Sequence, residues 1–325
     1  MHKRLVNHCT IDLSIIPDGP ILIKSGKEGA DPTKPDMEFV ETYHAGGRSI
    51  YLPGSSLKGA IRAHAERIVR TVGREDRTGD TRLPWANDPL NDNYDYLKDK
   101  TDKQKKLPSH KLYKESSFTD QLFGNTAIAS RIRFEDAYPD SEKPKPKLEE
   151  RNGVAIDRGF GSVAVGPFNY QVCTAGEFRT KIHLKNFTLA QLGLIGLVLR
   201  DLNDGWFGLG FAKSRGLGTV KVKYHSAIVQ YPSCELQDDQ ICVIGTQTCW
   251  SNTLLLGAGE FLKPDEAGSY GFPKPNREET PIRAQAMDLN FGVQLTWMGD
   301  TETGVPDLFM RSVRSWSQLL TRRAA

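Results

Sequence analysis

The heptapeptide at residues 53–59 constrains the fold of this chain more than any other segment. Its sequence is Pro-Gly-Ser-Ser-Leu-Lys-Gly, and it follows a short strand pattern at 49–52. Ser55 or Ser56 can serve as a helix N-cap, because a serine hydroxyl accepts a hydrogen bond from a free backbone N–H. Apolar residues then recur at helical spacing, at Leu57, Ile61, Ala65 and Ile68. The pattern predicts a strand, a tight turn and a helix of about four turns.

The rest of the chain alternates irregularly between strand and helix patterns. One or two strands are expected at 7–24, broken by the turn at 17–20, and the residues from 25 to about 47 are expected to form a loop. Further strands are expected at 128–134, 177–184 and 219–224. Helices are expected at 118–123, which Gly124 ends, and at 188–201, which Thr188 caps. A polar loop at 138–152 leads into a hairpin at 153–173, with strands at 154–156 and 168–173. This mixture predicts an α+β fold rather than a doubly wound parallel sheet.

The domain organisation follows from length and from changes in composition. A chain of 325 residues has room for about two domains. We expect a core at 1–225, with a solvated, charged insertion at about 73–115, where the window 98–114 holds seven Lys and two Asp. Residues 226–325 read as a C-terminal extension with short strands and a final helix.

Composition excludes several classes of protein. The net charge is only +3, which excludes a bulk polycation but allows a local basic groove. No apolar run approaches the length that spans a bilayer, and the N-terminus lacks the apolar region of a signal peptide. Five Cys without a Cys-x-x-Cys pair favour neither a disulfide framework nor a zinc knuckle. These features predict a soluble, reduced, cytoplasmic protein without membrane partners.

Two glycine-containing segments are candidate binding sites. In the heptapeptide, backbone N–H groups, two hydroxyls and Lys58 can converge on a phosphate, although a capped helix start explains the same residues. Residues 205–218 interleave aromatics with Lys213 and Arg215, which suits a nucleic-acid backbone, although tight turns also require these glycines. The order of elements around this stretch differs from that of a dinucleotide-binding fingerprint.

Other candidate binding residues are less specific signals by themselves. Residues 158–165 resemble the first motif of an RNA-recognition domain, but Ser162 and Val165 replace aromatic positions that would stack bases. Asp31 and Asp36 lie in a Gly/Pro-rich loop, where a carboxylate can hold a divalent cation, orient a ribose hydroxyl or simply form a turn. The histidines have no metal-ligand spacing.

Taken in order, these segments resemble the RAMP superfamily, specifically the backbone (seventh-family) subunits of type III CRISPR effector complexes. The resemblance covers about residues 7–224. It rests on the heptapeptide, the loop before it, Leu122-Phe123-Gly124, Ala155-Ile156-Asp157-Arg158 and the loop at 210–218. The stretch at 116–120 lacks the Cys that many relatives carry there, and the chain beyond 226 has no assigned counterpart.

The resemblance implies a modified ferredoxin-like (RNA-recognition-like) core that stacks along a CRISPR RNA. The helix with Ser55, Ser56, Lys58 and Arg62 would grip the guide, and Lys213 and Arg215 would also contact RNA. The hairpin at 153–173, with Arg158 and Phe160, would be a thumb that interrupts the guide–target duplex. Asp36, with Asp31 in reserve, would hold Mg²⁺ or another divalent cation for target cleavage.

The implied partners are CRISPR RNA, single-stranded target RNA and other effector subunits of the complex. The leading interpretation is a metal-dependent endoribonuclease. Two alternatives stay open at this level. One is a catalytically silent structural subunit with the same fold. The other is a guide-processing ribonuclease that would need an acid–base residue, for which His183 and His225 are the nearest candidates.

Overall fold

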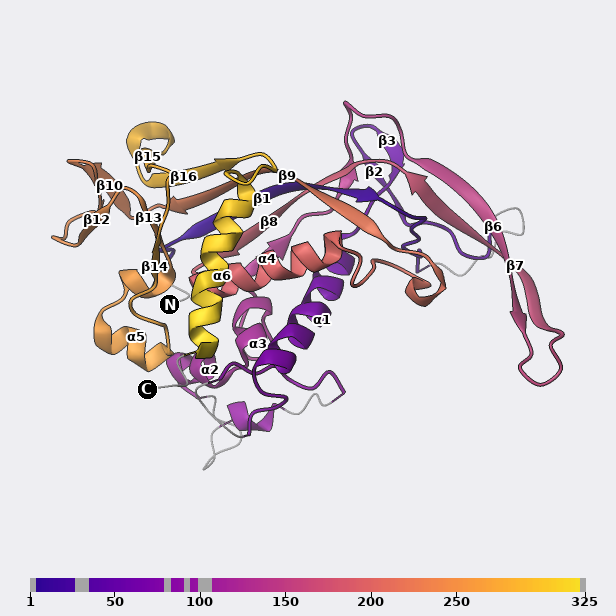
Figure 1. Ribbon diagram of the computed structural model, residues 1–325, viewed down its shortest axis with the longest axis horizontal. Coiled ribbons are helices and arrows are strands. Elements are labelled where there is room, and N and C mark those ends of the chain that lie inside the picture. The colour runs from indigo at the N-terminus through magenta and orange to yellow at the C-terminus, as the bar shows by residue number, and fades with distance from the viewer. Residues whose placement is uncertain (1–3, 27–34, 79–82, 91–93, 99–106, 322–325) are drawn as a thin grey trace.

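The computed structural model describes residues 4–26, 35–78, 83–90, 94–98 and 107–321 (Figure 1). Within them, the largest sheet is antiparallel, with strand order β15–β16–β9–β1–β8–β4, and β5 also pairs with β8. The strands are β1 (His8–Pro17), β4 (Ile132–Phe134), β5 (Tyr138–Pro139), β8 (Phe178–Lys185), β9 (Val220–Tyr231), β15 (Gln285–Ala286) and β16 (Val293–Met298).

The core of this sheet has ferredoxin-like connectivity. Along the chain the order is β1, α1 (Gly54–Val72), β4, β8, α4 (Leu189–Asn203) and β9. In space the four strands lie in the order β9–β1–β8–β4, so each helix connects two strands separated by one other strand. The predicted α+β class with a ferredoxin-like core is confirmed.

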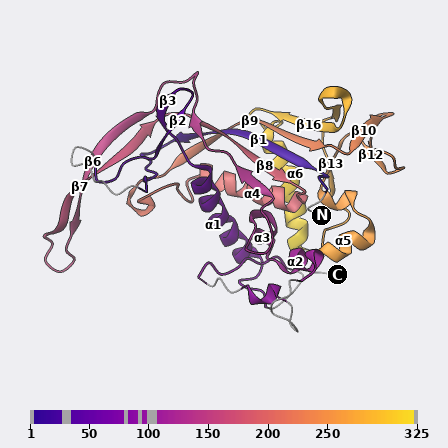
Figure 2. The ribbon, with the colours of Figure 1, turned by 180° about the vertical axis from the view of Figure 1, so that it is seen from behind.

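The two faces of the sheet differ in chemistry. Alternate residues of β1, including Cys9, Ile11 and Leu13, are buried toward the helices, which lie on one side of the sheet (Figures 1 and 2). The strand register places a series of basic residues on the opposite face: Arg133, Arg179, Lys181, His183, Lys185, Lys221 and Lys223. We call this surface the open sheet face.

The helix layer is fixed by local signals and by close packing. Thr188 caps α4, and its hydroxyl accepts a hydrogen bond from the Gln191 backbone while the Gln191 side chain accepts one from the Thr188 backbone. The final helix, α6 (Val305–Thr321), packs along α4 (Figure 1). A Cβ at Gly193 would come within 2.5 Å of the Ser312 carbonyl oxygen, so glycine permits this approach. The expected helix and its cap are confirmed.

The helix that follows the heptapeptide begins differently from the prediction. Its N-cap is Pro53 rather than a serine, and neither Ser55 nor Ser56 caps it. Gly54 is the first helical residue, and its N–H donates to Asp136 Oδ1 at 2.7 Å. A Cβ at Gly54 would come within 2.6 Å of the Phe134 carbonyl oxygen. The turn is therefore held against the β4–β5 connection, which local spacing cannot indicate.

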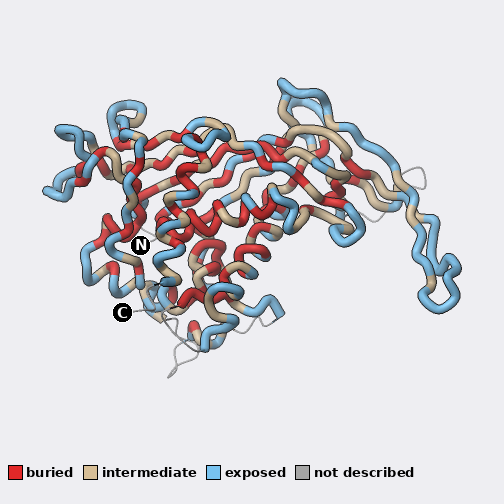
Figure 3. The backbone as a smooth tube through the Cα atoms, in the orientation of Figure 1, coloured by how far each residue is buried: buried red, intermediate tan, exposed pale blue. Residues whose placement is uncertain are grey.

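The hairpin predicted at 153–173 is present but longer than expected. Its strands are β6 (Lys147–Ile156) and β7 (Val163–Ala175), so the first strand begins inside the segment interpreted as a polar loop. The hairpin projects far from the sheet, and its outer half is exposed (Figures 1 and 3). We call residues 147–175 the thumb hairpin. Its charged first strand lacks a buried face, which is why alternation did not indicate it.

The charged insertion is not wholly solvated. Leu83, Trp85 and Ala86 are buried, and Leu97, in the turn η1 (Asp95–Leu97), joins a second apolar cluster. The helix α2 (Ser109–Glu115) contributes Leu112 and Tyr113 to that cluster, where α5 (Pro264–Tyr270) also packs. The solvated interpretation is therefore wrong for these segments, because sparse apolar residues pack against distant parts of the chain.

The C-terminal extension is integrated with the core. Strand β9 crosses the expected boundary at 225, and β16 and α6 complete the sheet and the helix layer. Smaller antiparallel sheets hold the remaining strands: β2 (Glu41–His44), β3 (Gly47–Ile50), β10 (Cys234–Gln237), β11 (Gln240–Val243), β12 (Cys249–Ser251), β13 (Leu254–Leu256) and β14 (Arg277–Glu279). The β2–β3 hairpin lies in a segment that the sequence analysis assigned mainly to a loop.

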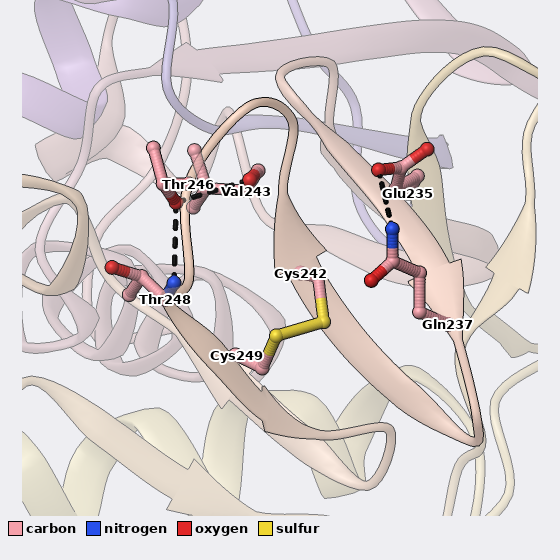
Figure 4. Close-up of a disulfide and its surroundings, with 7 residues drawn as sticks. All are labelled: Glu235, Gln237, Cys242, Val243, Thr246, Thr248 and Cys249. Atoms are coloured by element: carbon pink, nitrogen blue, oxygen red, sulfur yellow. Dashed lines mark hydrogen bonds between the residues drawn. A yellow bond between two sulfur atoms is a disulfide. The ribbon is translucent and has the colours of Figure 1, made fainter.

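One cysteine pair corrects the expectation of a fully reduced chain. Cys242 and Cys249 face each other across β11 and β12 and form a disulfide (Figure 4). Cys9, Cys173 and Cys234 are free and buried. The pairing depends on hairpin register, which the spacing of the cysteines alone does not show. No helix among the described residues is long and apolar enough to cross a membrane.

Candidate functional site

The structure separates the predicted site residues into distinct places. Ser55 and Lys58 line a pocket at the start of α1. Asp36 and the loop with Lys213 and Arg215 lie beside the middle of the thumb hairpin, at the inner end of its exposed half, which we call the thumb root. Arg158 and Phe160 are at the thumb tip. Ser56 is exposed on the first turn of α1 and does not line the pocket. Asp31 lies outside the described residues.

The pocket at the start of α1 is strongly basic. It has a volume of about 420 Å³, and we call it the helix-start pocket. Its polar lining comes from three strands, the β4 approach and α1: His8, Ser55, Lys58, Ser130, Arg131, Arg133, His183 and Lys185. The adjacent Asp136 already accepts the Gly54 N–H, so side chains rather than that amide provide the positive charge for an anion here.

Lys58 is held in this pocket by one hydrogen bond. Its Nζ donates to Ser130 Oγ at 2.9 Å, and partial burial, followed by the charge of Arg62, lowers the pKa of Lys58. No carboxylate pairs with Lys58 within the described ranges. Its ammonium can therefore contact a phosphate without first breaking an ion pair.

A histidine pair also lines the pocket. The His8 and His183 rings have centroids 5.6 Å apart. His183 Nε2 lies 2.8 Å from Glu135 Oε1, and its Nδ1 lies 3.3 Å from Thr10 Oγ1. Burial, followed by the neighbouring His183, lowers the pKa of His8, and the charges of Arg133 and Lys185 act in the same direction. A bound phosphate would instead favour protonated His8.

Arg62 has a structural environment. Its guanidinium donates to Asp120 Oδ1 and Glu66 Oε1, both at 2.8 Å, and to the Gly124 carbonyl oxygen at 3.0 Å. Asp120 is fully buried, and burial raises its carboxyl pKa while Arg62 opposes this shift. Arg62 therefore joins α1 to α3 (Phe118–Phe123), and two carboxylates already compensate its charge.

Asp36 is attached to the root of the thumb hairpin. Its Oδ2 accepts a hydrogen bond of 2.8 Å from the Asn169 N–H of β7. The next residue, Met37, donates from its N–H to Asn169 O at 3.2 Å and accepts from Gln171 N at 2.9 Å. The loop thus runs beside β7, and Asp36 presents an exposed carboxylate at the thumb root.

The Gly-rich loop lies beside the same root. Lys213–Arg215 forms a single 3-10 turn, and the Arg215 guanidinium carbon lies 5.1 Å from the Phe211 ring centroid. Gly210 has a φ of +80°, and a Cβ there would overlap the Leu22 carbonyl oxygen. Phe211 N donates to that same carbonyl at 2.7 Å. Glycine therefore allows the loop to reach the segment after β1, as both the turn and the binding interpretations require.

The thumb tip is a tight turn with an exposed aromatic residue. Asp157 Oδ1 accepts hydrogen bonds of 2.8 Å from the Gly159 and Phe160 backbones, and these bonds lower the pKa of Asp157. Phe160 is 93% exposed. An apolar ring held at the end of a hairpin is suited to insertion between stacked bases.

A divalent cation would find few protein ligands near Asp36. Across the described ranges, no group of three or more His, Cys, Asp or Glu side chains is arranged to hold a metal ion. Asp36 supplies one carboxylate, of which Oδ2 already accepts one hydrogen bond. This donor set fits Mg²⁺, which keeps several waters and commonly binds through one or two carboxylates and substrate phosphates.

Sequence reasoning missed several basic residues that the fold gathers. His8, Arg133 and Lys185 line the helix-start pocket with Lys58 although they come from three different strands. The signal was present in β8, where Arg179, Lys181, His183 and Lys185 occupy alternate positions. Period-two spacing places such residues on one sheet face.

The sequence matches a known protein family. The family model described as RAMP superfamily matches residues 17–221, which is more than half of the chain and includes Asp36, the helix-start segment, the thumb hairpin and the Gly-rich loop. No curated protein matches the chain.

Proposed function

Because this chain belongs to the RAMP superfamily, we propose that it is a CRISPR RNA-binding backbone subunit of a type III effector complex that cleaves complementary target RNA. Membership of the superfamily indicates a CRISPR-associated, RNA-binding role. The type III assignment, the position as a backbone subunit and the cleavage are our proposals.

The guide would bind along the open sheet face and the helix-start pocket. Lys58, Arg133 and Lys185 provide cationic groups around one cavity, and the sheet continues the positive series through Lys181 and Arg179. Carboxylates pair with five of the seven basic residues on this face: Arg133 and His183 with Glu135, Arg179 with Asp12, Lys221 with Asp18 and Lys223 with Glu177. Lys181 and Lys185 have no such partner among the described residues. Contacts of this kind recognise the RNA backbone rather than its sequence, and base pairing would read the target.

The thumb hairpin would separate one nucleotide from the guide–target duplex. It projects beyond the sheet and carries the exposed apolar residues Val154, Ile156 and Phe160. An apolar wedge between base steps unstacks them, at a cost of a few kcal/mol that contacts elsewhere must offset. Val154 lines one cavity with Phe168 and Tyr170, the neighbours of Asn169, so a nucleotide displaced at Val154 rather than at the tip would lie beside Asp36.

Cleavage would be an intramolecular transesterification. The target 2′-oxygen attacks the adjacent phosphorus and loses its proton, the bond to the 5′-oxygen breaks, and that oxygen takes up a proton. The products are a 2′,3′-cyclic phosphate and a free 5′-hydroxyl. Asp36 would hold a divalent cation, which supplies stabilisation of the charge that grows on the phosphoryl oxygens. The thumb would provide the unstacked, in-line geometry.

One observation carries this proposal: the hydrogen bond between Asp36 and Asn169, which places a loop carboxylate at the root of the thumb hairpin. A carboxylate that served only to form a turn would need no link to a projecting hairpin. The same contact supports a reaction site near the point where a displaced nucleotide would leave the duplex.

The test is cleavage of a labelled complementary RNA by the guide-loaded complex. Asp36→Asn keeps an oxygen that can accept the Asn169 N–H, and we expect it to lower the cleavage rate by at least ~10²-fold with target binding retained. Asp288→Asn, which changes an exposed carboxylate outside the thumb hairpin and the open sheet face, is the control and should cleave normally. Chelation should abolish cleavage, and Asp31→Ala should have a smaller effect than Asp36→Asn.

The alternatives predict different results. A wild-type complex that binds target and never cuts it would favour the structural subunit. Metal-independent cutting of a guide precursor, lost in His183→Ala or His225→Ala, would favour a processing enzyme. Full activity of Asp36→Asn at wild-type affinity would move the chemistry to Asp31 or to another subunit.

A further inference from the structure

A small aromatic cavity lies between the thumb hairpin and the Gly-rich loop. Its volume is about 170 Å³. Phe168 and Tyr170 of β7 form one side, and Phe211 and Arg215 of the loop form the other. The three rings are only partly buried, so they are available to a ligand rather than sealed within the core.

The wall on the thumb side depends on a glycine. Phe168 and Gly153 are opposite each other in the β6–β7 register. A Cβ at Gly153 would come within 2.6 Å of the Phe168 ring and 3.3 Å of the Tyr170 ring. Glycine therefore lets the Phe168 ring lie against the β6 backbone. The Phe168 and Tyr170 centroids are 6.3 Å apart.

The charge beside the cavity is positive. Arg215 lies over the Phe211 ring, and Lys213 is exposed on the same turn. Neither side chain pairs with a carboxylate in the part of the chain that the structure describes. An aromatic cavity bordered by cations suits a flat, electron-rich ring that is attached to a phosphate backbone.

The cavity is also adjacent to the proposed reaction site. Asn169, whose N–H binds Asp36, lies between Phe168 and Tyr170 in β7. A base held by these rings would keep its own ribose and phosphate near the Asp36 carboxylate. Holding the base would thus restrict the displaced nucleotide to the region where cleavage is proposed.

We propose that this cavity binds one unstacked nucleobase of the bound RNA, the nucleotide that the thumb hairpin displaces. The inference rests on the proposed function, because it requires RNA at the thumb root. Stacking on aromatic rings tolerates every base, so the cavity holds the displaced base without selecting a sequence.

The test compares two short single-stranded RNAs, an oligouridine and the same strand with abasic riboses at alternating positions. The full-length wild-type chain should bind the oligouridine about tenfold more tightly, the scale of one base–aromatic stack. Tyr170→Leu with Phe211→Leu keeps apolar volume but removes two rings, and it should reduce this preference nearly to one. The salt dependence should not change. Phe291→Leu, an exposed aromatic outside the cavity, is the matched control.

A second measurement reads the base directly. Fluorescence of 2-aminopurine at the displaced position of the target should be lower in the wild-type complex than in the complex with the double variant, because the cavity rings quench a stacked base. The cavity assignment would be overturned if wild type and the double variant preferred oligouridine over the abasic strand equally. An unquenched base in a complex that still cleaves target would also overturn it. Either result would leave the proposed function standing. A wild-type chain that binds neither strand would overturn both.

Discussion

Lys58 and Arg62 are one helical turn apart on α1, yet their surroundings give them different roles. The ammonium of Lys58 meets a single hydroxyl in a basic pocket, whereas Arg62 makes three hydrogen bonds, two of them to carboxylates. The sequence analysis grouped both as guide contacts. The structure favours Lys58 for RNA and Arg62 for the stability of the helix layer.

Replacing Lys58 should weaken RNA binding without affecting the fold. In Lys58→Ala, the log–log salt dependence of single-strand binding should become shallower by about 0.7, because one phosphate contact is lost. The loss should be equal for unrelated sequences. Arg67→Ala removes an exposed cation from the same helix and should leave the slope unchanged. Equal slopes for wild type and Lys58→Ala would place the RNA elsewhere.

Replacing Arg62 should instead destabilise the protein. Arg62→Met leaves the buried Asp120 carboxylate without its cation, and loss of one partner of a buried pair costs about 3 kcal/mol. Urea denaturation measures the loss. Adding Asp120→Asn should recover part of it, because the uncompensated charge is then absent. A stable Arg62→Met variant with weakened RNA binding would return Arg62 to the binding surface.

His8 should make RNA binding dependent on pH. His183 and Lys185 from β8, Arg133 from β4, Gln230 from β9 and Lys58 from α1 surround it. Its pKa in the folded protein lies below 6.5, so in RNA-free protein the unfolded state takes up the proton first as pH falls below 6.5, and stability decreases.

A bound RNA phosphate has the opposite effect, because it favours the protonated form of His8 in the folded protein. RNA affinity should therefore rise as pH falls below 6.5, and His8→Gln should flatten the rise. The measurement is the RNA dissociation constant between pH 7.5 and about 5.5, at constant ionic strength. The same pH profile in wild type and His8→Gln would remove His8 from the phosphate environment.

At the scale of elements, local patterns predicted what local interactions stabilise. Thr188 and Gln191 indicated α4, and Gly124, with a φ of +83°, indicated the end of α3. The buried packing of the insertion and the Cys242–Cys249 disulfide were not predicted. The first depends on contacts between separated segments, and the second depends on strand register. The residues of the helix-start pocket divide in the same way between local and long-range signals. The heptapeptide indicated Lys58, whereas His8 and Arg133 reach that pocket only through strand pairing.

The thumb hairpin should act on the duplex rather than on the guide. Replacing 160–165 by a Gly-Ser turn removes the exposed tip, including Phe160, without touching the open sheet face. Guide affinity should therefore stay nearly constant. The target positions that react with single-strand probes should change, because the wedge is lost. An unaltered probing pattern would argue that the thumb hairpin does not enter the duplex.

At the scale of the whole molecule, one helix-free sheet face connects the basic pocket to the thumb. The helices cover the opposite face, and β16 and α6 extend the sheet and helix layers with residues from the C-terminal extension (Figures 1 and 2). The extension is therefore structural support for the core, and its smaller sheets lie at the end of the molecule away from the thumb hairpin (Figure 1). That arrangement leaves the open sheet face available to a continuous RNA strand.

Sequencing the RNA that copurifies with this chain tests the central claim most directly. If the chain is a guide-binding subunit, the complex isolated from its native cells should contain RNAs that share a constant segment and differ in their guide segments. Lys58→Ala should reduce their yield, and Asp36→Asn should not. Cellular RNA recovered only in proportion to its abundance, with the same yield from Lys58→Ala, would contradict the account.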